Sequence, residues 1–400
     1  MEGRGRAARV RAVVGPALGL WWASRVALFA VVTLMSFVLA LPPAARIRGT
    51  GGWLLERFVW WDAFHFLRIA DRGYLPPELP CCDQAFFPGY PFATWTASVF
   101  TRGNLVLAGL LVTQVAASVA VVLLWRVAVQ PGPRGQGGNG SRVAGDPRVG
   151  RVAVLLLAVS PYGIFLSSVY SEALFLALSL GAWLAGLRGR WWWAGALAGA
   201  AAATRVNGLF LAAALAVMYL LQLRAQGRWR PRPDVVALAA PFLAVAGYLT
   251  YLRHRTGSWT DWQHAQSLSW QRETAWPWEG LRIGWHSLVT APSHDLVVTR
   301  ALDLVAVLGG LAFTAFLLWR RRWAEAVFLA PNVGVLVAST TLQSAPRYAL
   351  TWFPLYLMAA RWAVRDRPWG GRYVVPVALT VAPPLLAVLS VTFAMHLWIA

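Results

Sequence analysis

The chain has 400 residues, of which 58% are hydrophobic and only 13% are charged, and its mean hydropathy is +0.53. A soluble protein of this length would expose considerably more charge. Apolar runs recur from one end to the other, so the composition argues against a water-soluble enzyme. It predicts an all-α polytopic integral membrane protein that forms a single multi-pass domain over residues 1–400.

All 36 basic residues are arginine, and the formal net charge is +20. The lysine-free composition, rich in Ala, Gly, Val and Leu, is typical of a GC-rich bacterial genome. A charge of this size could indicate nucleic-acid binding, but the arginines gather in every second connection between apolar runs. By the positive-inside rule these connections are cytoplasmic, with the N-terminus inside and the C-terminus outside. The charge is therefore a topology signal of a cell-membrane protein, and no nucleic-acid partner is predicted.

Apolar runs predict about eleven membrane helices, at residues 16–41, 104–128, 152–168, 170–187, 191–204, 207–223, 234–252, 298–318, 323–342, 348–363 and 373–397. The first run is too long for a signal peptide and has no obvious cleavage site, so we interpret it as a retained span. Several runs are short, so neighbouring ones must pair as tight hairpins whose tips lie at or below the membrane surface.

Three longer connections separate these runs. The Gly/Pro-rich residues 130–150 are predicted to form a flexible cytoplasmic linker. The other two connections, residues 42–103 and 253–297, fall on the extracytoplasmic side together with most of the acidic residues. No internal repeat of the transporter kind is visible.

The first extracytoplasmic connection contains the stretch FVWWDAFHFLRIADRGY, in which ionisable residues alternate with aromatic ones. Residues 56–71 are predicted to form an amphipathic helix on the outer leaflet. On such a helix Asp62 and His65 share one face, and Trp61, His65 and Arg68 share an adjoining one. An anchoring helix with solvated charges is an open alternative, since such helices are common at membrane interfaces.

Three hairpin tips on the same side carry further polar residues. They are Tyr170 and Glu172, Arg205 and Asn207, and Arg347 and Tyr348. An unpaired charge inside an apolar hairpin costs on the order of 2.5–3.5 kcal/mol, so such residues are commonly paired or functional. A structural ion pair between Glu172 and Arg205, or a snorkelling Arg205, also explains them. Because all three tips and Asp62 share one face of the membrane, we predict a site there.

The residues of this face favour one kind of chemistry. The sequence has no Gly-rich phosphate loop, metal-ligand cluster or nucleophile elbow, so neither a metal nor a cofactor is expected. The adjacent Cys81 and Cys82 are interpreted as two thiols rather than a strained disulfide. One carboxylate, several arginines and an aromatic surface suit glycosyl transfer from a polyprenyl-phosphate sugar. The phosphate leaves already charged, arginines stabilise it, and Asp62 serves as general base in an inverting attack.

A family resemblance supports this chemistry. The run WWDAFHFLRIADRGY, followed by AFFPGYP at residues 85–91, resembles the first outer-loop motif of the PIG-V family of glycosylphosphatidylinositol mannosyltransferases. SPY…YSEALF, ATRVNG and PRYALTWFPLY resemble family segments in the same order, so the resemblance spans about residues 20–360. It implies a GT-C glycosyltransferase fold, a polyprenyl-phosphate-mannose donor and no required metal.

By the same resemblance, Asp62 is the essential acidic residue, and His65 occupies a motif position from which it orients a substrate. Arg205 and Arg347 are the candidates for the donor phosphate. The remaining candidate substrate-binding residues are Trp61, Arg68, Tyr170, Glu172, Asn207 and Tyr348. The acceptor is expected to be a lipid-linked glycan, a protein or another cell-envelope molecule. A transporter or flippase for a lipid or sugar, and a scaffold subunit with a degenerate site, are the alternative functions.

Overall fold

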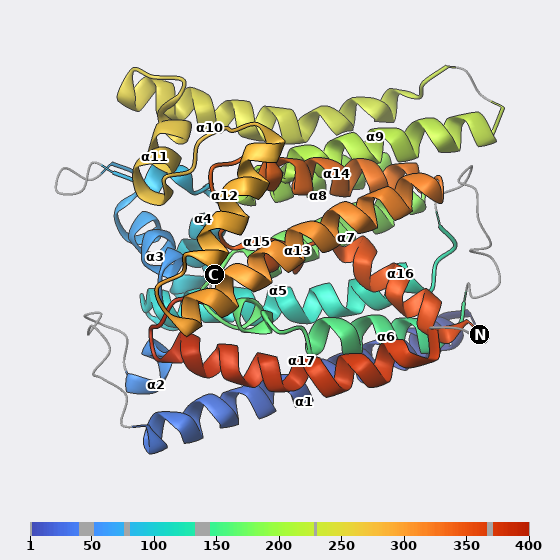
Figure 1. Ribbon diagram of the computed structural model, residues 1–400. Helices are drawn as coiled ribbons and strands as arrows, with labels where there is room; N and C mark the ends of the chain where they lie inside the picture. The colour runs from blue at the N-terminus through green and yellow to red at the C-terminus, as the bar shows by residue number, and fades with distance from the viewer. Residues whose placement is uncertain are drawn as a thin grey trace.

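The structure is a computed structural model that describes residues 2–39, 52–75, 81–132, 145–227, 230–365 and 371–399. Within these ranges the chain folds into a bundle of helices (Figure 1). Most of the predicted linker at 130–150 lies outside the described residues.

Six helical segments of the described chain are long and apolar enough to cross a membrane. They are the apolar part of α1 (Glu2–Val38), α5 (Leu105–Ala128), α9 (Gly208–Ala225), η5 with α10 (Pro233–Ala239 and Ala240–Thr256), α13 (His294–Trp319) and α17 (Gly371–Ala394). Four of the other five predicted runs overlap the shorter helices α7 (Glu172–Leu187), α8 (Trp191–Thr204), α14 (Trp323–Val337) and α16 (Phe353–Val364). The run at 152–168 is only partly helical, because α6 (Pro147–Ala158) ends in its middle and the short η4 (Gly163–Leu166) follows. The predicted all-α membrane architecture is confirmed.

The two ends of the bundle differ. The N-terminus lies at one end, while α3 (Asp62–Arg72) and α11 (Asp261–Trp270) lie at the opposite end, which we call the site end (Figure 1). At 1.5 Å per residue α5 is about 36 Å long and α7 only about 24 Å. Of the predicted hairpins, α8 and α9 pack on each other, whereas α6 packs mainly on α16, α5 and α1 rather than on α7.

The turn between α8 and α9 depends on a close approach of the two helices. A Cβ atom on Gly208 would lie 2.3 Å from Cα of Ala202, closer than any side chain tolerates. Only glycine permits this approach. The tight turn holds Arg205 and Asn207 at the site end.

The prediction of one helix over residues 56–71 is wrong. The chain forms α2 (Trp53–Glu56), leaves the helix, and begins α3 at Asp62. Phe58 and Val59 between the two helices are almost completely buried in the core, which takes the backbone out of the helix. The restart places the Asp62 carboxylate in the first turn of α3, where the helix dipole favours a negative charge.

The connection after α11 is pinned to the α14–α15 connection. The backbone N–H of Ala275 donates to the carbonyl of Ala338 (2.9 Å), and the backbone N–H of Thr340 donates to the carbonyl of Glu273 (3.0 Å). The pairing brings residues 271–275 beside α15 (Ala345–Ala349). The second long connection thereby contributes to the site end, while α12 (Pro277–Val289) packs on α13.

The interpretation of Cys81 and Cys82 as two thiols is also wrong. The structure joins them by a disulfide directly before η1 (Asp83–Ala85). Their neighbouring positions keep both sulfur atoms within bonding reach.

Candidate active site

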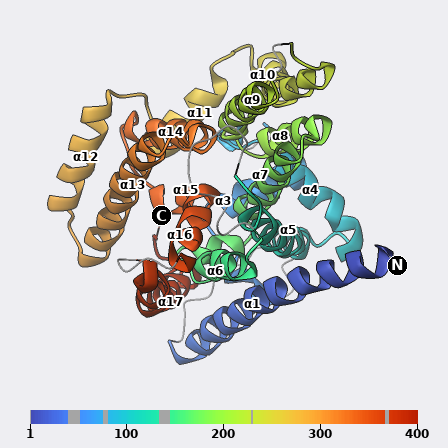
Figure 2. The ribbon, with the colours of Figure 1, turned by 90° about the vertical axis from the view of Figure 1, so that its right-hand side faces the viewer.

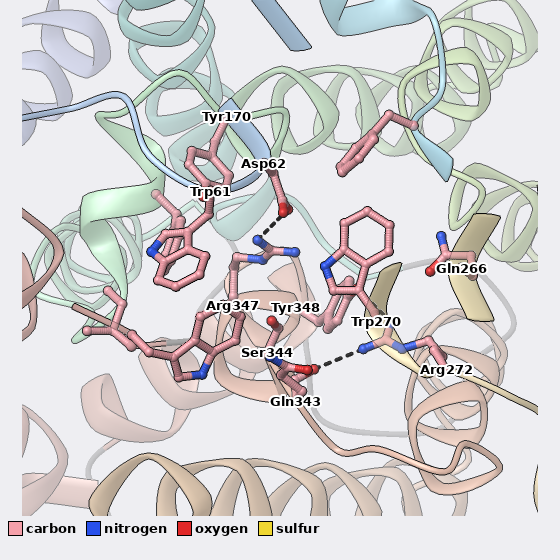
Figure 3. Close-up of a pocket in the computed structure, with 14 residues that line it drawn as sticks. Trp61, Asp62, Tyr170, Gln266, Trp270, Arg272, Gln343, Ser344, Arg347 and Tyr348 are labelled. Atoms are coloured by element: carbon pink, nitrogen blue, oxygen red, sulfur yellow. Dashed lines mark hydrogen bonds and ion pairs between the residues drawn. The ribbon is translucent and has the colours of Figure 1, made fainter. Parts of the chain in front are cut away.

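Four of the predicted residues form one chain of ion pairs at the site end. Arg347 on α15 donates to the Asp62 carboxylate over 2.6 Å, as Figure 3 shows, and its Nε lies 3.4 Å from Glu172. Arg205, which follows α8, donates to the same Glu172 oxygen over 2.7 Å. The predicted pairing of Glu172 with Arg205 is therefore present, and it extends to Asp62.

These charges are removed from water. Glu172 is 0% exposed, and Asp62 and Arg347 are each 9% exposed. Burial lowers the pKa of Arg347, but Asp62 and Glu172 outweigh it and hold that pKa well above its ordinary value. Arg347 therefore stays cationic and fixes the orientation of Asp62.

Arg272 joins this group from the second long connection, where the sequence showed no motif. It donates to the Tyr348 hydroxyl (2.9 Å) and to the Gln343 carbonyl (3.0 Å). The guanidinium groups of Arg205, Arg272 and Arg347 lie 5.2, 5.6 and 5.5 Å from the centre of the Tyr348 ring. Burial raises the pKa of Tyr348, but these three cations outweigh it and lower the pKa to about 8.

The balance of charge favours an anionic ligand. Three guanidinium groups face two carboxylates, which leaves a net charge of +1 with Tyr348 neutral. Among the described residues no carboxylate forms an ion pair with Arg272, and Asp303 acts on it only at longer range. The site therefore offers one cation without an ion pair beside a buried carboxylate, which is an arrangement suited to a phosphate ester.

The Asp62–Arg347 pair lines two cavities. A cavity of about 700 Å³ extends between α3, the α8–α9 turn, α11 and α14, and a smaller one of about 50 Å³ lies beside Trp61 and Trp270. They share the lining residues Asp62, Phe86, Gln266, Arg272, Arg347 and Tyr348. A third, polar cavity of about 250 Å³ shares Trp270 and Gln343 with the small one. Asp62 thus stands where the two cavities meet.

His65 points to a different partner. Its Nδ1 lies 2.7 Å from Asp83, and Arg68 Nε donates to the same carboxylate over 2.7 Å. The His65 ring stacks on Phe86 at 4.8 Å, and Phe86 in turn lines both cavities. His65 and Arg68 line neither cavity, so they are placed to position the cavity wall. No sequence pattern pointed to Asp83. Its partners His65 and Arg68 lie on α3, and the chain between α3 and η1 shows no period that would pair them.

The Asp83 carboxylate is expected to stabilise the fold above the acid range. Burial raises its pKa, but hydrogen bonds from Arg68 and His65 outweigh it and bring the pKa below the ordinary 3.8. Its stabilisation is therefore present above about pH 4 and is lost as the pH falls through the lowered pKa. Asp83→Asn should cost about 2 kcal/mol at pH 7 and much less at pH 3, as measured by unfolding in detergent. An equal cost at both pH values would contradict this assignment.

The other predicted residues pack around the ion-pair chain. Tyr170 donates to the Trp60 carbonyl (2.9 Å), and its ring lies 5.5 Å from the Arg347 guanidinium. Trp61 packs edge-on against Trp398 with ring centres 4.3 Å apart. Asn207 donates to Asn332 on α14, and both line the large cavity.

The fold and the site define a polytopic membrane protein with a charged, partly enclosed cavity at one end. The family described as "Mannosyltransferase (PIG-V)" matches residues 23–250, and the chain belongs to it.

Among curated proteins, the chain is 37% identical over 172 residues to GPI alpha-1,6-mannosyltransferase 2 of Mus musculus, a match that covers 42% of this chain and 34% of the mouse protein. The match to the protein of the same name from Homo sapiens is 35% over 178 residues and covers 44% and 33%. The alignments thus span about a third of these relatives.

The structure is similar to the Archaeoglobus fulgidus oligosaccharyltransferase in its apo form, with a TM-score of 0.44 and 11% identity, covering 93% of this chain and 56% of that one. A complex of the archaeal enzyme with an inhibitory peptide and a dolichol-phosphate gives 0.41 and 12%, covering 92% and 55%. Both scores are low, and the site is therefore interpreted from its own residues.

Proposed function

We propose that the protein is a GT-C-type, metal-independent mannosyltransferase of the extracytoplasmic side. It moves mannose from a polyprenyl-phosphate-mannose donor to a lipid-linked glycan or another cell-envelope acceptor. The observation that carries the proposal is the placement of Asp62, which is fixed by Arg347 where two cavities meet and shares both cavities with Arg272, a cation without an ion pair. Membership of the PIG-V family supports the sugar and the reaction class.

The donor is assigned to the large cavity. Arg272 and Arg205 line it and would hold the phosphate through charge-assisted hydrogen bonds. Its wall also includes the apolar residues Phe210 on α9 and Val335 on α14, and Val335 is 53% exposed. The polyprenyl chain would leave past these residues into the bilayer.

The acceptor is assigned to the opposite side of Asp62. The polar cavity presents Ser287, Asp303, Thr340 and Gln343, and shares Trp270 with the small cavity beside Asp62. Hydroxyl, amide and carboxylate groups next to an indole ring suit a sugar, which has polar edges and an apolar face.

The reaction follows from these positions. The acceptor hydroxyl attacks the anomeric carbon while Asp62 takes its proton. The bond between that carbon and the phosphate oxygen breaks, and its electron pair leaves with the phosphate. Arg272 and Arg205 stabilise the departing anion, so no general acid is needed. Attack from the side opposite the phosphate inverts the anomeric configuration.

Arg272→Gln is expected to raise the KM for the donor roughly 10- to 100-fold, since a hydrogen bond to a charged group contributes about 1.5–3 kcal/mol. The exposed Arg255 lies in the last turn of α10 and lines none of the three site cavities. Arg255→Gln is the matched control and should leave the KM unchanged. Equal effects of the two substitutions on the donor KM would contradict the phosphate assignment.

Donor binding should weaken as the pH rises through about 8. The pKa of Tyr348 is lowered to about 8, so above it the phenolate cancels the net charge of +1 around Arg205, Arg272 and Arg347. We expect the donor KM to increase about fivefold, a change of roughly 1 kcal/mol. In Tyr348→Phe this increase should be absent. A variant that retains the same pH dependence would show that another group is responsible.

The donor class is tested with purified protein in EDTA. Radiolabelled polyprenyl-phosphate-mannose should pass its label to a lipid extract of the parent membrane, whereas radiolabelled GDP-mannose should not. Transfer from GDP-mannose in the absence of any polyprenyl phosphate would overturn the proposal.

A further inference from the structure

A second large cavity lies away from the site, on the outer face of α5, α7 and α8. Its volume is about 680 Å³, and its lining is almost entirely apolar. Figure 2 shows these three helices on the side of the bundle away from α12 and α13. We call this cavity the outer groove.

Small residues hollow out the outer groove. Ala177, Gly181 and Ala185 recur at every fourth position of α7 and line it. They lie along one face of the helix, so the larger side chains of α5 and α8 stand above them as rims. Val115 on the α5 rim is 55% exposed. The groove is therefore open along its length to the surrounding membrane.

The end of the outer groove nearest the N-terminal end of the bundle carries three arginines. Arg126 lies in the last turn of α5, and Arg188 and Arg190 lie between α7 and α8. Burial, together with repulsion from Arg126 and Arg190, lowers the pKa of Arg188. The guanidinium group of Arg188 therefore lies close enough to those of Arg126 and Arg190 to be repelled by both.

These three arginines have no carboxylate partner among the described residues. The described carboxylates of the arginine-rich connections are paired elsewhere: Asp146 with Arg148, Asp234 with Arg232, and Glu325 with Arg322. A concentration of positive charge at the end of an apolar groove is complementary to a molecule with an anionic head and a long apolar tail.

We propose that the outer groove binds an anionic glycerophospholipid from the leaflet on the N-terminal side. Its head-group phosphate lies among Arg126, Arg188 and Arg190, and its acyl chains lie over Gly181. From Arg126 back to Leu111 the groove follows α5 for about 22 Å, which exceeds the roughly 15 Å hydrocarbon depth of one leaflet. Apolar contacts alone give no preference over bulk lipid, so the head group confers the selectivity. This inference is independent of the proposed reaction.

The test is thermal unfolding of the whole protein in mild detergent with added lipid. Phosphatidylglycerol should raise the midpoint by about 3 °C or more, and phosphatidylcholine should not. The rise should disappear in the double variant Arg188→Gln/Arg190→Gln and in Gly181→Leu, whose new side chain would occupy the groove. The control Arg224→Gln/Arg230→Gln removes the same charge from exposed positions outside the groove and should retain the rise.

Three results would overturn the proposal. The first is a rise of equal size with both lipids, and the second is a rise that survives in both groove variants. The third is a larger rise with polyprenyl phosphate than with phosphatidylglycerol, which would assign the groove to the donor lipid. If one groove variant fails to fold, the other decides.

Discussion

Replacing Asp62 by asparagine is expected to lower the rate of mannosyl transfer by about 10³-fold, because a positioned general base contributes about 10² to 10⁴. The amide oxygen can still accept the hydrogen bond from Arg347, and Glu172 still faces the same guanidinium. Because Asp62 belongs to a buried ion-pair network, the variant should unfold at a lower midpoint than the wild type, but the folded protein should bind the donor while failing to activate the acceptor. The measurement is the transfer rate at saturating donor, together with the unfolding midpoint.

The same helix offers a matched control. Asp71 is a carboxylate of α3 with an exposed side chain, and its only described ion pair, with the adjacent Arg72, is exposed as well. Asp71→Asn should transfer mannose at the wild-type rate. An Asp62→Asn variant that keeps the wild-type rate would remove Asp62 from the mechanism.

The second large effect is expected on stability. Glu172 is fully buried and bridges Arg205 and Arg347. Glu172→Gln leaves the part-buried Arg205 without its ion pair and leaves the buried Arg347 with the carboxylate of Asp62 alone. Removing one member of a buried ion-pair network costs about 3–5 kcal/mol. We expect a clearly lower unfolding midpoint in detergent, with a loss of transfer activity that follows from the displaced Arg347.

Glu279→Gln provides the comparison for this prediction. Glu279 pairs with Arg282 on the exposed face of α12, where an ion pair contributes little. Its substitution should leave the midpoint unchanged. If Glu172→Gln behaved in the same way, the buried ion-pair chain would not hold the hairpin tips together.

The sequence predicted the parts of the site that carry a local signal. An unpaired charge within an apolar hairpin is costly, so Glu172, Arg205 and Arg347 were visible as residues that needed partners. The contact between Asp62 and Arg347 joins residues far apart in the chain. It depends on how α3 and α15 pack, which hydropathy does not encode.

Two further contributions could not be predicted from local patterns. Arg272 lies in a connection without a recognisable motif, and it reaches the site because residues 273–275 pair with the α14–α15 connection. The break before Asp62 follows from the burial of Phe58 and Val59, whereas helical periodicity alone favoured one continuous helix.

The central claim is that this chain transfers mannose from a lipid-phosphate donor by means of Asp62. Its most direct test supplies radiolabelled polyprenyl-phosphate-mannose to three membranes: those of a strain that lacks the gene, and those of the same strain complemented with either wild type or Asp62→Asn. We predict a labelled product with the wild type only, and its identity would reveal the acceptor. The same labelled products in all three membranes, or with Asp62→Asn as with the wild type, would contradict the claim.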